Sequence, residues 1–251
     1  MKLPDKKWLI FVPLLAIYIA GMFIDVMEID AAQYAAMSLG MLDTGKYLEI
    51  YYRGEDYIDK PPLLFWTSAL SFKLFGVSNF SYKLPSVLFT LLGLFATYRL
   101  GRLLYSEVAG FYAALTLASC QAWFLINHDV RTDTILAACT VLGIWQLVEF
   151  TRTGKIANIL WGAVGIAGAM LSKGPIGLMV PALAIGTDLL LKRKWSAIFR
   201  WQWLLMLLIV FILLIPMMYG LYTQYDLSGG KPTYNGVITS GLRFYFWTQS
   251  F

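Results

Sequence analysis

The stretch Tyr57-Ile58-Asp59-Lys60-Pro61-Pro62-Leu63 places an acidic and a basic residue beside two prolines, at the edge of a long hydrophobic region. Residues 28–59, which lead into it, are polar, acidic and rich in tyrosine. Almost every segment after it is long and apolar, with charged residues confined to the joins. This contrast predicts either a solvated catalytic loop attached to a bundle of membrane helices, or an ordinary loop between two spans.

The composition indicates an integral membrane protein. Of the 251 residues, 59% are hydrophobic and 14% are charged, which leaves too few charges to cover a soluble globule. Crossing the hydrocarbon takes about 20 apolar residues per helix, and the apolar runs lack the alternation of barrel strands. We predict an all-α fold, a polytopic transmembrane helical bundle that forms a single module over residues 1–251.

Seven apolar segments are predicted to span the membrane. The first follows three lysines but has no convincing cleavage site, so we interpret it as an uncleaved span and not as a signal peptide. The sequence ends four residues after the run Phe244-Tyr245-Phe246-Trp247 without a polar tail, which predicts that it is the N-terminal part of a longer chain. The predicted spans are residues 8–24, 84–98, 108–126, 134–150, 156–171, 175–191 and 202–222.

The distribution of charge between the joins predicts the orientation. The joins on the side of the N-terminus carry eleven basic and four acidic residues, a net charge of +7, and the rest of the chain carries −2, within the overall +5. Because basic residues accumulate on the cytoplasmic side, residues 28–82 are predicted to lie outside, as the first extracytoplasmic loop. A basic membrane protein is the ordinary case, so we predict membrane lipids and no nucleic acid as partners.

The first extracytoplasmic loop is predicted to contain two short helices. Asp30-Ala31-Ala32-Gln33 fits a capping box that opens a helix through Met41, and Asp43-Thr44-Gly45 stops it. Pro61 and Pro62 fit the first turn of a second short helix that ends at Phe75. This second helix is aromatic and too short to span, so it is predicted to lie along the membrane interface.

Charged residues gather at the joins that are predicted to lie outside. A carboxylate there can orient or deprotonate a hydroxyl group, and lysine and arginine can hold a departing phosphate. Nucleoside triphosphates are absent on that side, so a transferase there needs a donor that is already activated in the membrane. The charged residues are Glu28, Asp30, Asp59, Lys60, His128, Asp129, Arg131, Asp133 and Lys173.

Several of these residues also have a purely structural interpretation. Asp30 fits a helix N-cap. Lys60 and Lys173 fit lysines that reach the lipid headgroups from a helix end. Arg131 and Asp133 fit a salt bridge at the rim that contributes little stability.

The tyrosines and cysteines have structural interpretations as well. Tyr57 and the neighbouring tyrosines fit an aromatic belt at the membrane interface. Cys120 and Cys139 lie in apolar runs without metal-ligand spacing, so we interpret both as small core residues and predict no metal ligand among the residues.

The order of the motifs along the chain resembles that of the GT-C membrane glycosyltransferases. Within them it is similar to the bacterial branch that contains the lipid A aminoarabinose transferases and relatives of the dolichyl-phosphate-mannose protein mannosyltransferases. The resemblance covers nearly the whole chain, and its specificity comes from the order and spacing of all motifs together. The motifs are Glu28-Ile29-Asp30-Ala31-Ala32-Gln33-Tyr34-Ala35, Asp59-Lys60-Pro61-Pro62-Leu63, Phe75-Gly76-Val77, Leu84-Pro85-Ser86, Arg131-Thr132-Asp133-Thr134 and Ser172-Lys173-Gly174-Pro175.

The resemblance implies a transferase that moves a sugar from a polyprenyl-phosphate donor to a lipid, glycan or protein acceptor at the outer face of the bacterial inner membrane. It implies that Asp30 and Asp133 are catalytic and that Asp59-Lys60 lies near the lipid phosphate. We predict that Tyr57, Arg131 and Lys173 also bind substrate.

Two features depart from the family pattern. Ala31 stands where many members have a second acidic residue, which weakens a metal role there, although the resemblance leaves a divalent metal open. The distal half of the family's length is missing, so acceptor-binding residues are expected elsewhere. Two other functional classes remain open: a lipid or solute transporter, and a non-catalytic assembly subunit. Transporters tend to bury ionisable groups near the membrane midplane, whereas here the charges lie at the joins.

Overall fold

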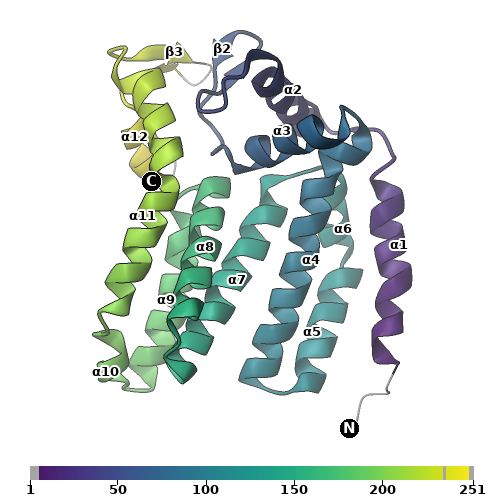
Figure 1. The fold of residues 1–251 in the computed structure, drawn as a ribbon, viewed down its shortest axis with the longest axis vertical. Helices are drawn as coiled ribbons and strands as arrows, with labels where there is room; N and C mark the ends of the chain where they lie inside the picture. The colour runs from purple at the N-terminus through teal and green to yellow at the C-terminus, as the bar shows by residue number, and fades with distance from the viewer. Residues whose placement is uncertain (1–5, 234–235, 249–251) are drawn as a thin grey trace.

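The protein is a bundle of apolar helices with a smaller layer of helices and hairpins across one end (Figure 1). The computed structural model describes residues 6–233 and 236–248. In this part of the chain, the predicted all-α class is confirmed, and the strands are confined to two short hairpins. The elements of the bundle are η1 (Lys7–Ile10), α1 (Phe11–Gly21), α4 (Asn79–Leu104), α5 (Glu107–Ser119), α6 (Gln121–His128), α7 (Thr132–Thr153), α8 (Ile156–Lys173), α9 (Ile176–Leu191), α10 (Trp195–Ile198) and α11 (Gln202–Leu221).

All seven predicted spans are helical, but they differ in length. Four helical segments within the described residues are long and apolar enough to cross a membrane, and α5 with α6, which meet at a bend of 54°, make a fifth if they form one span. The remaining two, Lys7–Gly21 and Ile176–Leu191, are apolar but shorter. The chain is therefore a multi-pass membrane protein, and the count of seven spans stays a prediction.

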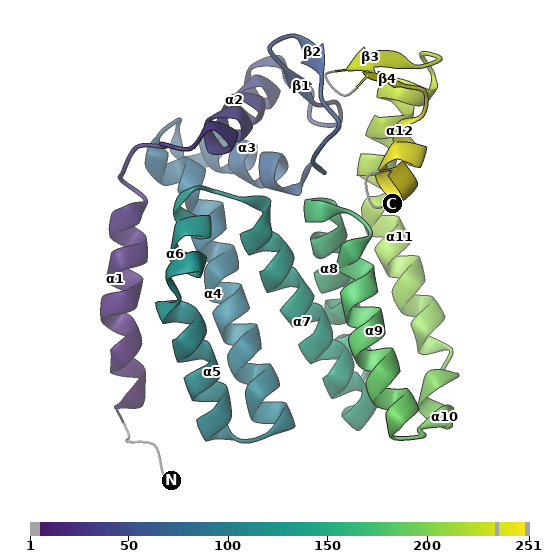
Figure 2. The ribbon, with the colours of Figure 1, turned by 180° about the vertical axis from the view of Figure 1, so that it is seen from behind.

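Small residues bring the helices of the bundle close together. A side chain on Gly165 of α8 would lie 2.7 Å from the backbone nitrogen of Gly143 in α7, and one on Gly177 of α9 would lie 2.5 Å from the backbone of Ala169 in α8. Lipid tails supply no hydrophobic drive between helices, so close packing of small residues holds such helices together. Figure 2 shows α7, α8, α9 and α11 side by side in the bundle.

The layer across the end of the bundle begins with two helices, α2 (Ile29–Thr44) and α3 (Leu63–Phe75). Both were predicted, to within two or three residues at each end. Gly45 ends α2 with a φ of 70°, and Pro62 is the N-cap of α3. We call this end of the molecule the α2 end.

The predicted capping box at Asp30 is wrong. Glu28 is the N-cap residue of α2, and its side chain accepts a hydrogen bond of 3.1 Å from the backbone nitrogen of Ala31. Asp30 lies inside the first turn instead. Glu28 accepts from the amide three residues on, the ordinary N-cap spacing, so the helix begins two residues earlier than an Asp30 cap would give.

Two hairpins complete the layer and were not predicted. Strands β1 (Tyr51–Tyr52) and β2 (Glu55–Asp56) are joined by Arg53 and Gly54, both with positive φ, as a two-residue hairpin turn requires. The second hairpin consists of β3 (Lys231–Thr233) and β4 (Gly236–Ile238). The remaining elements at this end are the turns Tyr222–Asp226 and Phe244–Thr248, and α12 (Gly241–Arg243).

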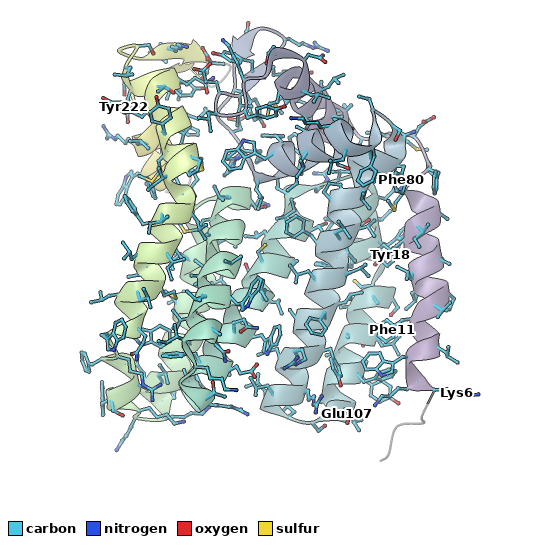
Figure 3. The ribbon with its side chains drawn as sticks, viewed as in Figure 1. Lys6, Phe11, Tyr18, Phe80, Glu107 and Tyr222 are labelled. Carbon is cyan, nitrogen blue, oxygen red and sulfur yellow. The ribbon has the colours of Figure 1, made fainter. Side chains whose placement is uncertain are left out.

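The joins predicted to lie on the two sides of the membrane fall at opposite ends of the bundle, while the orientation itself stays a prediction. Lys6 and Glu107 lie at the end away from α2, whereas Phe80 and Tyr222 lie towards it (Figure 3). Cys139 is buried as predicted, but Cys120 is exposed, so its interpretation as a core residue is wrong. Cys120 occupies the bend between α5 and α6, where it is the N-cap residue of α6.

Candidate functional site

Arg131 lies at the centre of a charged cluster at the α2 end. It directly precedes α7, and its guanidinium approaches Glu28 Oε1 at 2.8 Å and Asp30 Oδ2 at 3.4 Å. The side chain of Asp30 remains 48% exposed, so its carboxylate is accessible from outside. The predicted rim salt bridge between Arg131 and Asp133 is replaced by these contacts to α2.

Asp133 and Lys173 form a second pair beside the first. Asp133 lies in the first turn of α7, where the helix dipole favours a negative charge. Lys173 is the last residue of α8, and its Nζ lies 2.5 Å from Asp133 Oδ1. The two motifs, 40 residues apart in the sequence, therefore meet in the fold. Lys173 has an acidic partner and does not simply extend towards headgroups.

Two tyrosines connect the cluster to the predicted binding loop. The pKa of Tyr34 is raised to about 12, first by burial and then by the negative charge of Asp30. The pKa of Tyr57 is also raised, first by burial, then by Tyr34 and by the charge of Asp59. Both rings pack edge-on against Phe65, at 5.7 and 6.2 Å between centroids. At neutral pH both hydroxyls therefore remain protonated and able to donate hydrogen bonds.

Lys60 occupies a different position from the other cations. Its side chain is half-buried, and it has no ion-pair partner among residues 6–233 and 236–248. It lines a small cavity of about 20 Å³ together with Tyr57, Gln224 and Tyr245. A lysine without an acidic partner in a partly enclosed site is suited to an anionic ligand.

Gln224 fixes the loop that carries these residues, and no pattern in the sequence predicted this role. Its Nε2 donates to the carbonyl of Ile50 at 2.9 Å and to Asp56 Oδ1 at 2.7 Å, and its Oε1 accepts from the Ile50 amide at 3.2 Å. Lys231 also pairs with Asp56, at 3.2 Å. The segment after α11 thereby holds the loop from a position about 170 residues away.

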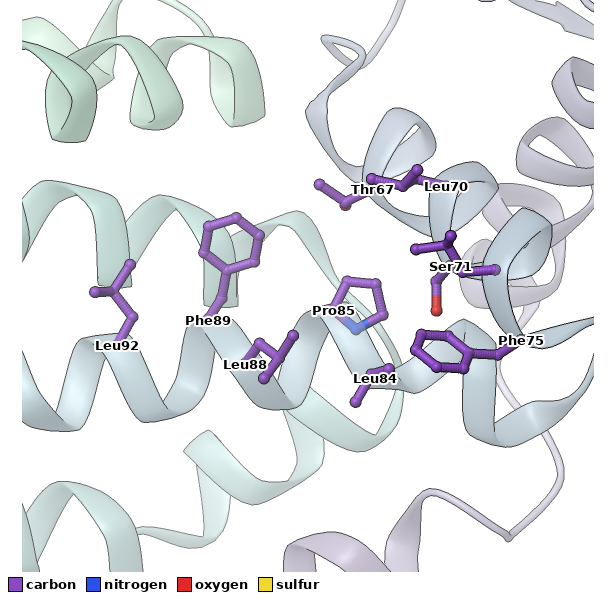
Figure 4. Close-up of a pocket in the computed structure, with 10 residues that line it drawn as sticks. Thr67, Leu70, Ser71, Phe75, Leu84, Pro85, Leu88, Phe89 and Leu92 are labelled. Atoms are coloured by element: carbon purple, nitrogen blue, oxygen red, sulfur yellow. The ribbon is translucent and has the colours of Figure 1, made fainter.

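Two apolar cavities lie near the α2 end, one between helices of the bundle and one where α3 meets α4. The larger, of about 510 Å³, lies between α4, α7, α8 and α11. The smaller, of about 330 Å³, lies between α3 and α4 (Figure 4). Phe89 and Leu92 line both. The larger one includes Leu63, three residues after Lys60, and Leu171, two residues before Lys173. The wall of the larger cavity thus includes residues two or three positions from each lysine, although neither lysine lines it.

The described residues do not assemble a metal centre. Within residues 6–233 and 236–248 there is no group of three or more His, Cys, Asp or Glu side chains placed to hold an ion. Glu28 and Asp30 both contact the guanidinium of Arg131, and Asp133 contacts the ammonium of Lys173. Each carboxylate of the cluster is thus adjacent to a cation of the protein itself.

The chain is similar to bacterial arabinosyl transferases over most of its length. It is 28% identical to the undecaprenyl phosphate-alpha-4-amino-4-deoxy-L-arabinose arabinosyl transferase 2 of Sodalis glossinidius, over 68% of this chain and 32% of that protein. It is 27% identical to the corresponding transferase of Shewanella sediminis, over 76% of this chain and 36% of that protein. The chain therefore spans about a third of the length of the curated relatives it matches.

The fold matches a solved structure. ArnT from Cupriavidus metallidurans bound to undecaprenyl phosphate superposes with a TM-score of 0.82, over 98% of this chain and 44% of that one, at 20% identity. The apo state of the same protein gives a TM-score of 0.78, over 86% of this chain and 42% of that one, at 22% identity. Residues 59–219, well over half of the chain, match the family described as dolichyl-phosphate-mannose-protein mannosyltransferase. The chain belongs to this family of membrane glycosyltransferases.

Proposed function

We propose that this chain carries the donor-binding and catalytic residues of a membrane glycosyltransferase. The enzyme moves a sugar from a polyprenyl-phosphate carrier to a lipid, glycan or protein acceptor at the outer face of the bacterial inner membrane. One observation carries the proposal: a cluster of carboxylates and cations lies at the end of the bundle where Leu63 and Leu171, close in sequence to Lys60 and Lys173, line an apolar cavity. A polyprenyl phosphate needs this combination, because its head is anionic and its tail is a hydrocarbon.

The reaction can be written with the residues of the cluster. The acceptor hydroxyl attacks the anomeric carbon of the donor sugar and gives its proton to Asp30, which lies half-exposed at the start of α2. The bond from that carbon to the phosphate oxygen breaks, and the departing phosphate is stabilised by Lys60. Arg131 and Lys173 add positive charge, while Asp133 orients Lys173 at 2.5 Å.

The remaining predicted residues bind and shape the donor site. Tyr57 is a protonated hydrogen-bond donor next to Asp59, and both lie in the loop that ends at Lys60. The prolines that follow direct the chain into α3, whose first residue lines the larger cavity. We therefore propose that the phosphate binds on the Lys60 side of Pro61 and Pro62 and the start of the hydrocarbon chain on the Leu63 side.

The relatives support a polyprenyl-phosphate donor. The matched transferases are named for undecaprenyl phosphate-linked aminoarabinose, and the matched structure holds undecaprenyl phosphate. The placement of the charged residues at one end of the bundle also favours transfer over transport, because transporters tend to bury ionisable groups near the midplane. The sugar and the acceptor are to be identified by experiment.

The first test is binding of the carrier. Native mass spectrometry of the detergent-purified protein should show retention of undecaprenyl phosphate and not of undecaprenol, which has the same tail without the charge. Equal retention of the two would mean that the cluster does not recognise phosphate. The acceptor is then sought by mass analysis of lipid A, surface glycans and secreted proteins from cells with and without the gene.

A further inference from the structure

The first turns of α4 bind the chain on both sides of Glu28 and Asp30. Asn79 Nδ2 donates to Asp25 Oδ1 at 2.7 Å. The hydroxyl of Tyr82 donates to the carbonyl of Ala31 at 2.6 Å. Residues 22–28 form no helix or strand, so these bonds, together with those of Lys83, set the path by which the chain reaches the candidate site.

Lys83 is the most deeply buried member of this group. It is 1% exposed, and its Nζ donates to the carbonyls of Ile24 at 2.8 Å and Gly21 at 3.2 Å. Gly21 is the last residue of α1, so the ammonium group lies at the negative end of that helix. A buried charge is tolerated only when it is hydrogen-bonded, and here the partners are backbone oxygens of the connecting segment.

The group does not belong to the substrate site itself. His128 of α6 approaches the Lys83 amine at 3.3 Å from the other side, and neither residue lines the two apolar cavities. The ammonium of Lys83 is occupied by carbonyls and a histidine, so it has little access to a phosphate. Its contacts point to the backbone that precedes α2.

We infer that Asn79, Tyr82 and Lys83 of α4 are positioning residues that hold the Glu28 and Asp30 carboxylates against Arg131. The inference rests on the proposed function for its effect on catalysis. Arg131 directly precedes α7 and the two carboxylates lie at the start of α2, so nothing in the local sequence fixes their separation. The bonds from α4 fix it, because they hold the chain at Gly21, Ile24, Asp25 and Ala31.

Removing these bonds should lower kcat more than it raises KM for the donor. Misplacement of a catalytic group by about 1 Å costs on the order of a hundredfold in rate, so we expect Lys83→Met to lower kcat by about tenfold to a hundredfold. Donor KM should change by less than about threefold, because Lys60 and the cavities lie outside the affected segment. Tyr82→Phe removes one hydroxyl without changing the ring, and its effect should be smaller and in the same direction.

The matched control is Tyr105→Phe. Tyr105 lies at the other end of α4 and is 81% exposed, so this change should leave kcat unaltered. Hydrogen exchange provides a readout that does not depend on activity. In Lys83→Met, amides of residues 25–34 should exchange faster while those of α7 and α8 keep their wild-type rates. Faster exchange throughout the bundle would mean that Lys83 only supports folding, and would overturn the inference.

The Asn79 and Asp25 pair allows a rescue experiment. Asn79→Asp places two carboxylates where an amide and a carboxylate now lie 2.7 Å apart, and should lower kcat and speed exchange at residues 25–34. Adding Asp25→Asn restores an amide–carboxylate pair with the members exchanged, and should recover both. A double variant no better than the single one, or variants with wild-type kcat and exchange, would refute positioning. If the wild-type protein transfers no sugar from a polyprenyl phosphate, the proposed function fails, and the exchange data still decide whether α4 holds the segment.

Discussion

The two ends of the bundle both carry ion pairs, but the pairs have different surroundings. At the end away from α2, Arg99 pairs with Glu149 at 3.9 Å and also lies over the ring of Trp145, and Lys192 pairs with Asp188 within one helix at 2.6 Å. At the α2 end, the pairs join three different helices, and two protonated tyrosines and two apolar cavities adjoin them. The first set joins helix ends within the bundle, and the second also joins the start of α2, in the covering layer, to the bundle.

The comparison shows that ion pairing alone does not identify a site. Exposed pairs contribute about 0–1 kcal/mol to stability wherever they lie. What distinguishes the α2 end is that its charged groups come from the starts of α2 and α7 and the end of α8. This end also holds Lys60, which has no ion-pair partner in the part of the chain that the structure describes, and apolar cavities. A change at the α2 end should therefore affect transfer or binding, whereas a matched change at the other end should not.

Thiols placed at the two ends of the bundle should differ completely in labelling by a reagent that cannot cross the membrane. With Cys120 replaced by serine, Val77→Cys and Leu191→Cys place exposed thiols at opposite ends, since Val77 is 59% and Leu191 80% exposed. A membrane-impermeant maleimide should label Val77→Cys in intact spheroplasts and Leu191→Cys only after lysis. The opposite pattern would place the cluster in the cytoplasm and remove the reason for a donor activated in the membrane.

The largest effect on activity is expected at Asp30. Asp30→Asn keeps the side-chain shape but removes the base, and loss of a general base typically costs a factor of about 10²–10⁴ in rate. Expression and melting temperature should stay normal, because Glu28 and not Asp30 caps α2. The measurement is sugar transfer to a hydroxyl acceptor by the full-length protein.

Asp188→Asn is the counterpart at the other end. Asp188 pairs with Lys192 in the same way that Asp30 pairs with a cation, yet the change should leave transfer near the wild-type rate. Near-normal transfer by Asp30→Asn would show that this carboxylate is not a base. If the acceptor is an already ionised phosphate, the loss should be smaller and would report on orientation alone.

Lys60 should contribute to binding more than to the chemical step. Hydrogen bonds to charged groups contribute roughly 1.5–3 kcal/mol, so Lys60→Ala should weaken binding of undecaprenyl phosphate by about tenfold to a hundredfold. Lys192→Ala, at the other end, should leave the affinity unchanged. Unaltered affinity in Lys60→Ala would mean that Lys60 only extends towards the lipid headgroups and does not bind the carrier phosphate.

The sequence predicted the elements that depend on local patterns. The apolar runs gave helices at all seven predicted positions, and Gly45 and Pro62 end α2 and begin α3 where their backbone preferences require it. The residue types of the site were also predicted, because charged groups at helix joins are visible in the order of the chain. The prediction that they lie at the same end of the bundle followed from counting the predicted membrane spans between them.

The pairing of the residues could not be predicted in the same way. Arg131 pairs with Glu28 and Asp30 and not with its neighbour Asp133. Asp133, the second residue of α7, pairs instead with Lys173 of α8, while Arg131 lies beside the start of α2. Gln224 reaches Ile50 through the close approach of α11, where a side chain on Gly220 would lie 2.1 Å from the carbonyl oxygen of Leu48. Both arrangements depend on helix packing across long separations in sequence.

Glu28 allows a test of the corrected helix start. Loss of an N-cap side chain typically costs about 1 kcal/mol, so Glu28→Ala should lower the melting temperature in detergent by a few degrees, as measured by tryptophan fluorescence. Glu107→Ala, which removes an exposed ion pair at the other end, should lower it less. Equal shifts would indicate that the Glu28 bond to Ala31 contributes no more than a surface contact.

The smallest effect is expected from the pH response of Tyr34. Its folded pKa, raised to about 12 by burial and by Asp30, exceeds the unfolded value of about 10, so the folded state holds this proton more tightly. The associated stability is complete below pH 10 and is lost as the pH rises towards 12. Tyr34→Phe should therefore leave the pH–rate profile between about pH 6 and 9 unchanged, and it should reduce the loss of stability measured above pH 10.

The counterpart is Tyr105→Phe, at the exposed end of α4, which should alter neither measurement. A change in the profile near neutral pH in Tyr34→Phe would mean that this hydroxyl takes part in proton transfer, and the cluster would then contain a second acid–base group beside Asp30.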